Sequence, residues 1–142
     1  MTFQLLATLC AAIFAGAALY INLVEHPARM SLGAATALAE WRPSYQRATL
    51  MQAPLAIVGL LAAIAAWVLG AGRVWLVGGV LLGAVVPFTL LVIFATNKQL
   101  LDPAIGGDLD RARLLLDRWN RLHAVRSVLG LAALVTFLVL LR

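Results

Sequence analysis

The sequence has little charge and very few side chains that react or bind metals. Of its 142 residues only 12% are charged, two are histidines and one is a cysteine, whereas 63% are hydrophobic. A soluble domain has about a quarter of its residues charged, so this composition excludes an ordinary soluble protein. The single cysteine, Cys10, excludes an internal disulfide, and we expect it to be a small buried apolar side chain.

Several kinds of site also have no matching pattern. The sequence contains no HxxxH or CxxC spacing, no phosphate-binding glycine loop and no Ser/His/Asp arrangement. No basic stretch is interleaved with aromatic residues, which argues against nucleic-acid binding. The net charge of +5 instead suits contact with the anionic headgroups of membrane lipids.

What the sequence does contain is four long apolar segments. Each is close to the ~20 residues that a helix needs to cross ~30 Å of hydrocarbon. The first has no basic residues before it, as a signal peptide would, so we expect it to be retained. With no repeat or linker, residues 1–142 are predicted to form a single all-α domain, a four-helix transmembrane bundle. The predicted helices span residues 3–24, 50–69, 74–95 and 124–141.

The connections between these segments carry further predictions. The short stretch Gly70–Gly72 predicts a hairpin between the second and third helices, and Pro87 predicts a kink in the third. Asp108 is a predicted N-cap. From there a helical pattern runs without a breaker to Leu141, ~33 residues or ~50 Å, so the fourth helix is expected to extend into the cytoplasm. In the loop 25–49, we expect Trp41 to anchor a short interfacial helix.

The distribution of basic residues predicts the orientation in the membrane. The loops 25–49 and 96–123 hold eight lysines and arginines, whereas the opposite side has only Arg73 and Arg142. The positive-inside rule therefore places both loops in the cytoplasm and both termini outside it. We expect an integral protein of a bacterial inner membrane.

Polar residues gather at the cytoplasmic ends of the predicted helices. In the first and fourth helices they are spaced i, i+4, i+7 and continue stripes of small residues, so both sets are predicted to face the bundle interior. The second helix adds a similar set, and the third ends in polar residues on the same side. These residues are Asn22, His26 and Arg29, then Trp119, His123 and Arg126, then Tyr45, Thr49 and Gln52, and finally Asn97.

This cluster suits acid–base chemistry on a hydrophobic molecule. His26 or His123 is a candidate general base near neutral pH. Arg126 and Asn97 are candidates to stabilise negative charge, and Trp119 is a candidate to stack on the substrate. The residues predicted to line the substrate site are Trp119, Glu25, Arg29, Tyr45, Gln52 and Asn22.

The charged residues of the cluster need partners or solvent at this depth. We expect Arg126 to pair with Glu25, and Arg29 and Arg47 to reach lipid headgroups. His26, His123 and Glu25 also form an alternative three-ligand metal site, and two facing histidines are an alternative haem site. The primary expectation is that no cofactor is used.

At these residues the chain resembles a known family. Residues 20–29, 87–100 and 119–126 look like three motif blocks of the DUF1772 membrane proteins, which include the fungal anthrone oxygenases. The matching positions are Glu25, His26, Arg29, Asn97, Trp119, His123 and Arg126. The resemblance implies a four-helix membrane protein. It also implies an oxygenase that converts an anthrone to an anthraquinone without an evident flavin or nicotinamide motif.

Together the residues and the resemblance predict a membrane oxygenase or oxidoreductase, a monooxygenase of the anthrone oxygenase kind. Its expected partners are membrane lipid, a small lipophilic aromatic substrate and dioxygen. Two alternatives stay open: a non-enzymatic binding or assembly subunit, in which the same cluster fixes helix packing, and a haem- or metal-binding membrane protein. A transporter is disfavoured because the outer half of the bundle has no polar path.

Overall fold

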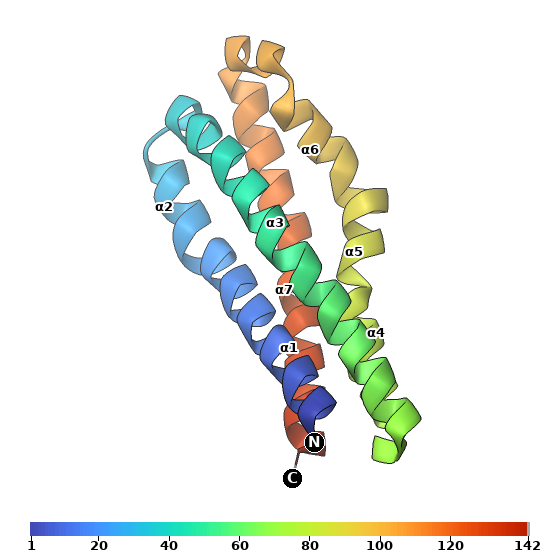
Figure 1. Ribbon diagram of the computed structural model, residues 1–142. Coiled ribbons are helices and arrows are strands. Elements are labelled where there is room, and N and C mark those ends of the chain that lie inside the picture. The colour runs from blue at the N-terminus through green and yellow to red at the C-terminus, as the bar shows by residue number, and fades with distance from the viewer. Residues whose placement is uncertain (142) are drawn as a thin grey trace.

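The computed structural model describes residues 1–141, and within them the chain is almost entirely helical with no strand. Four antiparallel helical rods lie side by side, and the two termini meet at one end of the bundle (Figure 1). All four rods are long and apolar enough to cross a membrane, which fits an integral membrane protein. The predicted all-α four-helix fold is therefore confirmed.

The first two rods are longer than predicted. The first consists of α1 (Thr2–Tyr20), a π-helical turn η1 (Ile21–Glu25) and α2 (His26–Ser31). The second consists of α3 (Ala34–Ala66) and a π-helical end η2 (Trp67–Ala71). Only Leu32 and Gly33 separate the rods, and Gly33 has a φ of 89°, a conformation that glycine adopts without strain.

The third rod is interrupted and the fourth is regular. The third consists of α4 (Val74–Gly83), α5 (Val85–Phe88), a π-helical turn η3 (Thr89–Ile93) and α6 (Phe94–Leu101). The interruptions flank Pro87, which has no N–H to donate to the preceding turn. A 3₁₀ turn η4 (Pro103–Gly107) leads to α7 (Leu109–Leu140). Asp108 caps α7 as predicted, since its side chain accepts a hydrogen bond from the Arg111 N–H at 3.0 Å.

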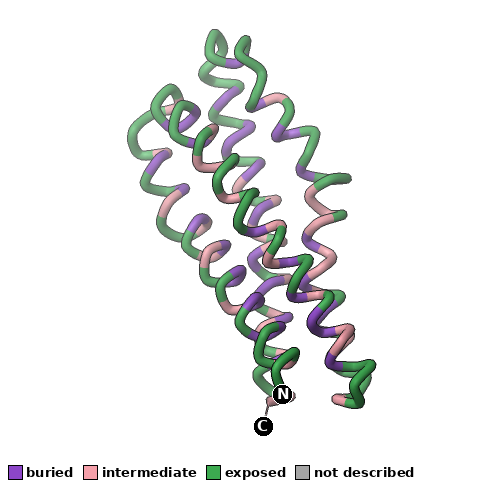
Figure 2. Tube along the Cα trace, in the orientation of Figure 1, coloured by how far each residue is buried: buried purple, intermediate pink, exposed green. Residues whose placement is uncertain are grey.

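The rods pack as a square. The α1 helix packs against α3 and α7, and α4 packs against the same two helices, so α1 and α4 lie on a diagonal. Only Gly72 and Arg73 separate η2 from α4, and both Gly70, inside η2, and Gly72 have positive φ, which confirms the predicted hairpin. Buried positions recur along the inward sides of all four rods (Figure 2).

The prediction that residues 25–49 form a loop is wrong, and so is the predicted interfacial role of Trp41. Helix α3 begins at Ala34 and continues through Pro43 and Pro54. Trp41 is fully buried, stacked on Tyr45 with ring centres 4.9 Å apart and edge-on to Trp119 at 5.7 Å. Burying so large an aromatic surface outweighs the missing proline hydrogen bonds, so the helix extends beyond the apolar segment from which it was predicted.

The interior consists of two apolar clusters with polar side chains at the level between them. One cluster lies toward the termini and is built from small and aromatic residues such as Ala11, Phe14 and Phe137. Cys10 belongs to it and is buried, as expected. The other lies toward the opposite end and includes Leu38, Trp41, Leu116 and Trp119. The polar residues therefore lie inside the bundle and not at its rim.

Candidate functional site

The candidate site is this polar level together with the aromatic residues beside it. On α7 the buried residues His123 and Ser127 fall between the two apolar clusters, and Arg126 is half-buried at the same level. The first rod contributes Asn22 from its π-helical turn, and α3 contributes Gln52, which is 1% exposed. π-helical turns of this kind often occur at functional sites.

Trp119 brings the two histidines together. Its ring centre lies 4.8 Å from that of His123 and 6.0 Å from that of His26. Both imidazoles are buried, so the expected inward orientation of both helices is found. The two histidines nevertheless differ: within the described residues neither ring nitrogen of His26 has a hydrogen-bond partner, whereas His123 is tied to Asn22.

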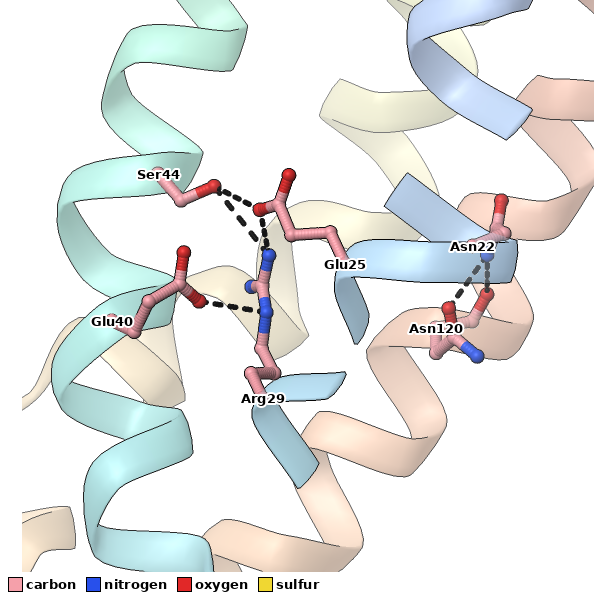
Figure 3. A network of polar contacts seen from close by, with 6 residues as sticks. All are labelled: Asn22, Glu25, Arg29, Glu40, Ser44 and Asn120. Carbon is pink, nitrogen blue, oxygen red and sulfur yellow. Dashed lines mark hydrogen bonds and ion pairs between the residues drawn. The ribbon is translucent and has the colours of Figure 1, made fainter. Parts of the chain in front are cut away.

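Asn22 is the centre of a hydrogen-bond network between the first rod and α7. Its side-chain Nδ2 donates to the backbone oxygen of Asn120 at 3.0 Å and to the Asn120 side-chain oxygen at 2.6 Å (Figure 3). Its Oδ1 lies 2.5 Å from the Ser127 hydroxyl and 3.0 Å from Nδ1 of His123. Sequence reasoning placed Asn22 against the substrate and missed Ser127.

Arg126 does not form the expected ion pair with Glu25. Its Nη2 donates to the side-chain oxygen of Gln52 at 2.9 Å, and the guanidinium lies over the Phe14 ring, 5.6 Å from the ring centre. Both partners are uncharged, and Arg126 has no carboxylate partner within the described residues. The prediction failed because Glu25 lies nearer to another arginine, Arg29, one helical turn away on its own rod.

Arg29 is buried in a charged network instead of reaching lipid headgroups as expected. It pairs with Glu25 through Nη2 and with Glu40 through Nε at 2.7 Å, and Ser44 donates to Glu25 at 2.5 Å (Figure 3). This network joins the first rod to α3. Sequence reasoning missed Glu40 and Ser44 because they fell in the predicted loop, and Arg47 is exposed.

Asn97 and Tyr45 meet on the other side of α3. The Asn97 Nδ2 donates to the Tyr45 hydroxyl at 3.2 Å, and Asn97 is 1% exposed. Several buried polar atoms nearby have no hydrogen-bond partner within residues 1–141, and leaving such an atom unpaired costs about 1–3 kcal/mol. They are Asn97 Oδ1, Thr96 Oγ1, Gln52 Nε2, Arg126 Nε and Trp41 Nε1.

Two adjoining cavities open onto these groups. A small inner cavity of about 10 Å³ is bordered by His123, Arg126, Trp119 and Gln52, with Tyr45 and Thr49 among its other lining residues. A larger apolar cavity of about 170 Å³ lies between α3 and the third rod, and its lining shares Tyr45, Thr49 and Arg126 with the inner cavity. None of its remaining lining residues was predicted as a site residue, because all but Thr89 are apolar and none can ionise: Ala53, Val85, Val86, Thr89, Leu90 and Phe94.

The alternative metal site is not assembled as a set of free ligands. Glu25 is engaged by Arg29 and Ser44, and both imidazoles lie against the Trp119 indole. Within residues 1–141 no group of three histidine, cysteine or carboxylate side chains is close enough together to hold a metal ion. The Trp119 indole also lies beside both histidines of the alternative haem site.

Comparison with known proteins identifies the family. No curated protein and no solved structure matches the chain. A family model described as anthrone oxygenase matches residues 41–136, which contain Trp41, Asn97, Trp119, His123 and Arg126. Of the three stretches that suggested this family, residues 87–100 and 119–126 lie within the match and residues 20–29 lie before it. Since the match covers more than half of the sequence, the chain belongs to the anthrone oxygenase family, the DUF1772 family.

Proposed function

We propose that the protein is a membrane oxygenase that oxidises a small lipophilic aromatic substrate of the anthrone class. The observation that carries this proposal is the position of Arg126. Arg126 borders both the apolar cavity, which suits the rings of such a substrate, and the inner cavity beside His123. A cation, an imidazole and an apolar binding space thus adjoin one another.

The apolar cavity suits a flat aromatic molecule that arrives from the bilayer. A cavity of about 150 Å³ accommodates benzene, so about 170 Å³ holds part of a fused-ring system. Leu90 and Phe94 line the cavity and are 61% and 53% exposed on the flank of the third rod, where lipid would lie. The rest of the substrate would extend past these two side chains toward the hydrocarbon.

The groups at the inner end suit proton abstraction followed by reaction with dioxygen. His123 takes a proton from the methylene carbon of the substrate, and the anion that forms is delocalised onto the ketone oxygen. Arg126 and the Tyr45 hydroxyl stabilise this oxygen, while Asn97 holds Tyr45 in place. Gln52 holds Arg126, and Trp119 packs against His123.

The subsequent oxidation balances without another reductant. Dioxygen adds to the carbanion, and the proton held by His123 passes to the resulting peroxide. The carbon then loses its remaining hydrogen as the O–O bond breaks, which leaves a ketone and one molecule of water. The substrate carbon supplies every electron that dioxygen takes up, so we propose a reaction without a cofactor.

Within this proposal, Glu25, Arg29 and Asn22 support the site and do not bind substrate. Their polar atoms are used in networks between helices, and none of the three borders the two adjoining cavities. A bacterial inner membrane, with the loops around residues 32 and 105 on the cytoplasmic side, remains part of the proposal and rests on the distribution of basic residues.

Turnover by the purified protein tests this function. In lipid nanodiscs with an anthrone and dioxygen, we expect conversion to the anthraquinone and uptake of dioxygen. An ultraviolet–visible spectrum and metal analysis of the same sample test the absence of haem and metal. His123→Gln should lower turnover by about 10²–10⁴-fold, whereas His26→Gln should stay within about tenfold of the parent. A folded protein that binds the anthrone but never oxidises it would instead favour a binding subunit.

A further inference from the structure

The amide of Asn22 uses all of its hydrogen-bonding capacity. An asparagine side chain has two N–H donors and two lone pairs on its oxygen. In Asn22 the nitrogen faces two oxygens of Asn120, and the oxygen faces the Ser127 hydroxyl and Nδ1 of His123. The four partners match the four sites, so the group is fully satisfied.

The backbone oxygen of Asn120 determines which way this amide points. A backbone carbonyl oxygen only accepts hydrogen bonds, and it lies 3.0 Å from Nδ2 of Asn22. Rotating the amide by half a turn would place the Asn22 oxygen against that carbonyl oxygen, with two acceptors facing each other. The side-chain oxygen of Asn22 therefore has to point toward Ser127 and His123.

That orientation determines the position of the proton on His123. The Asn22 oxygen accepts only, so the ring nitrogen 3.0 Å away from it has to carry a hydrogen. A neutral imidazole has one N–H, and which nitrogen bears it is set by the hydrogen bond that the ring makes. We propose that Asn22 is a positioning residue that holds the His123 proton on Nδ1 and leaves the lone pair on Nε2 for the inner cavity.

The two histidines differ in how their ring nitrogens are held. Neither nitrogen of His26 has a partner within residues 1–141, and His26 borders neither of the two adjoining cavities. His123 has one nitrogen fixed by a neighbour and borders the inner cavity. The stack on Trp119 further limits rotation of the His123 ring. A general base needs an oriented lone pair, and of the two histidines, both within the described residues, His123 alone meets this condition.

The tautomer itself follows from hydrogen bonding alone, whereas its catalytic meaning rests on the proposed function. The two are therefore tested by different measurements. The tautomer is measured by a proton–nitrogen correlation spectrum of the protein labelled with ¹⁵N-histidine, in nanodiscs and without substrate. Only two histidines are present, so the His26→Gln variant assigns the signals.

In the parent protein we expect the neutral His123 ring to carry its proton on Nδ1, although free imidazole side chains in water favour Nε2. Asn22→Leu removes the acceptor, so the proton should shift to Nε2. Asn120→Ala is the matched control because it keeps the backbone carbonyl that orients Asn22, and it should preserve the parent tautomer. A proton on Nε2 in the parent protein would overturn the inference even if no variant folds, as would an unchanged tautomer in Asn22→Leu.

Turnover provides the second readout. If Asn22 orients the base, Asn22→Leu should lower kcat with little change in KM, since Asn22 borders neither adjoining cavity. Asn120→Ala should leave both constants within a few-fold of the parent. Should the spectra show the expected tautomers while the protein binds the anthrone without oxidising it, the proposed function fails and the positioning of His123 by Asn22 stands. Full turnover by His123→Gln would overturn only the role of His123 as the base.

Discussion

The guanidinium of Arg126 on α7 is held by the side-chain oxygen of Gln52 on α3, at a distance of 2.9 Å, and by no carboxylate within the described residues. A half-buried cation with only neutral partners costs stability, because these partners replace its hydration incompletely. A protein that uses this cation for chemistry has a reason to keep it.

Replacing Arg126 should therefore raise the stability of the protein and lower its activity. We expect Arg126→Met to raise the free energy of unfolding by on the order of 1 kcal/mol, because an uncompensated charge is removed. The same change should lower turnover of the anthrone by about 10²-fold or more, because the developing oxyanion loses its cation. Thermal unfolding and turnover are measured on one preparation.

The control for Arg126 is Arg47→Met. Arg47 is exposed and has no hydrogen bond or ion pair within residues 1–141. Its replacement should therefore change the free energy of unfolding and the turnover only slightly. Turnover of Arg126→Met within about tenfold of the parent would contradict a role for this cation in the reaction.

Replacing Arg29 should have the opposite effects to replacing Arg126: lower stability with turnover retained. Its removal leaves Glu25 and Glu40 facing each other without a cation, so Arg29→Met should lower the free energy of unfolding by on the order of 3 kcal/mol. Adding Glu25→Gln should restore part of this loss by removing the less exposed of the two carboxylates. Activity per folded molecule should remain, and a specific loss of turnover at unchanged stability would show that Arg29 acts on the substrate.

The approach of α1 to α7 depends on Gly130. A Cβ atom added to Gly130 would lie 2.7 Å from Cδ1 of Phe14, a fully buried ring that also lies under Arg126. Gly130→Ala should therefore cost about 1–3 kcal/mol of unfolding free energy through overpacking. Gly16→Ala on the exposed side of α1 is the matched control, since nothing lies within 4 Å of the added atom and alanine favours the helix. Equal stability of the two variants would rule out this close contact.

The orientation in the membrane is tested by reporter fusions. A reporter at the C-terminus should behave as extracytoplasmic, and one inserted near Gly106, between α6 and α7, as cytoplasmic. The motivation is the excess of lysine and arginine on the side of residues 96–123. The reverse pattern of reporter activity would place the candidate site toward the other face of the membrane.

Part of the fold was predictable because it depends on composition and local chemistry. The four apolar segments predict four spanning helices, since a helix satisfies its own backbone in lipid. Asp108 predicts the start of α7, and the glycines at positions 70 and 72 predict the hairpin. The stripe of alanines before Asn22 predicts which face of the first rod is buried.

The partners of the polar residues were decided by tertiary packing. Residues 25–49 lie between two apolar segments and were predicted to be a loop, but burial of Trp41 against Trp119 extends α3 through Pro43. That extension brings Glu40 and Ser44 close to Arg29 and Glu25. Glu25 therefore pairs with Arg29, and Arg126 donates a hydrogen bond to Gln52 instead. Helical spacing places a residue on a face of its own helix, whereas a hydrogen-bond partner also depends on the rotation and depth of the neighbouring helix. The sequence by itself therefore determined four spanning helices with inward-facing histidines, and only their packing decided which histidine has a fixed proton.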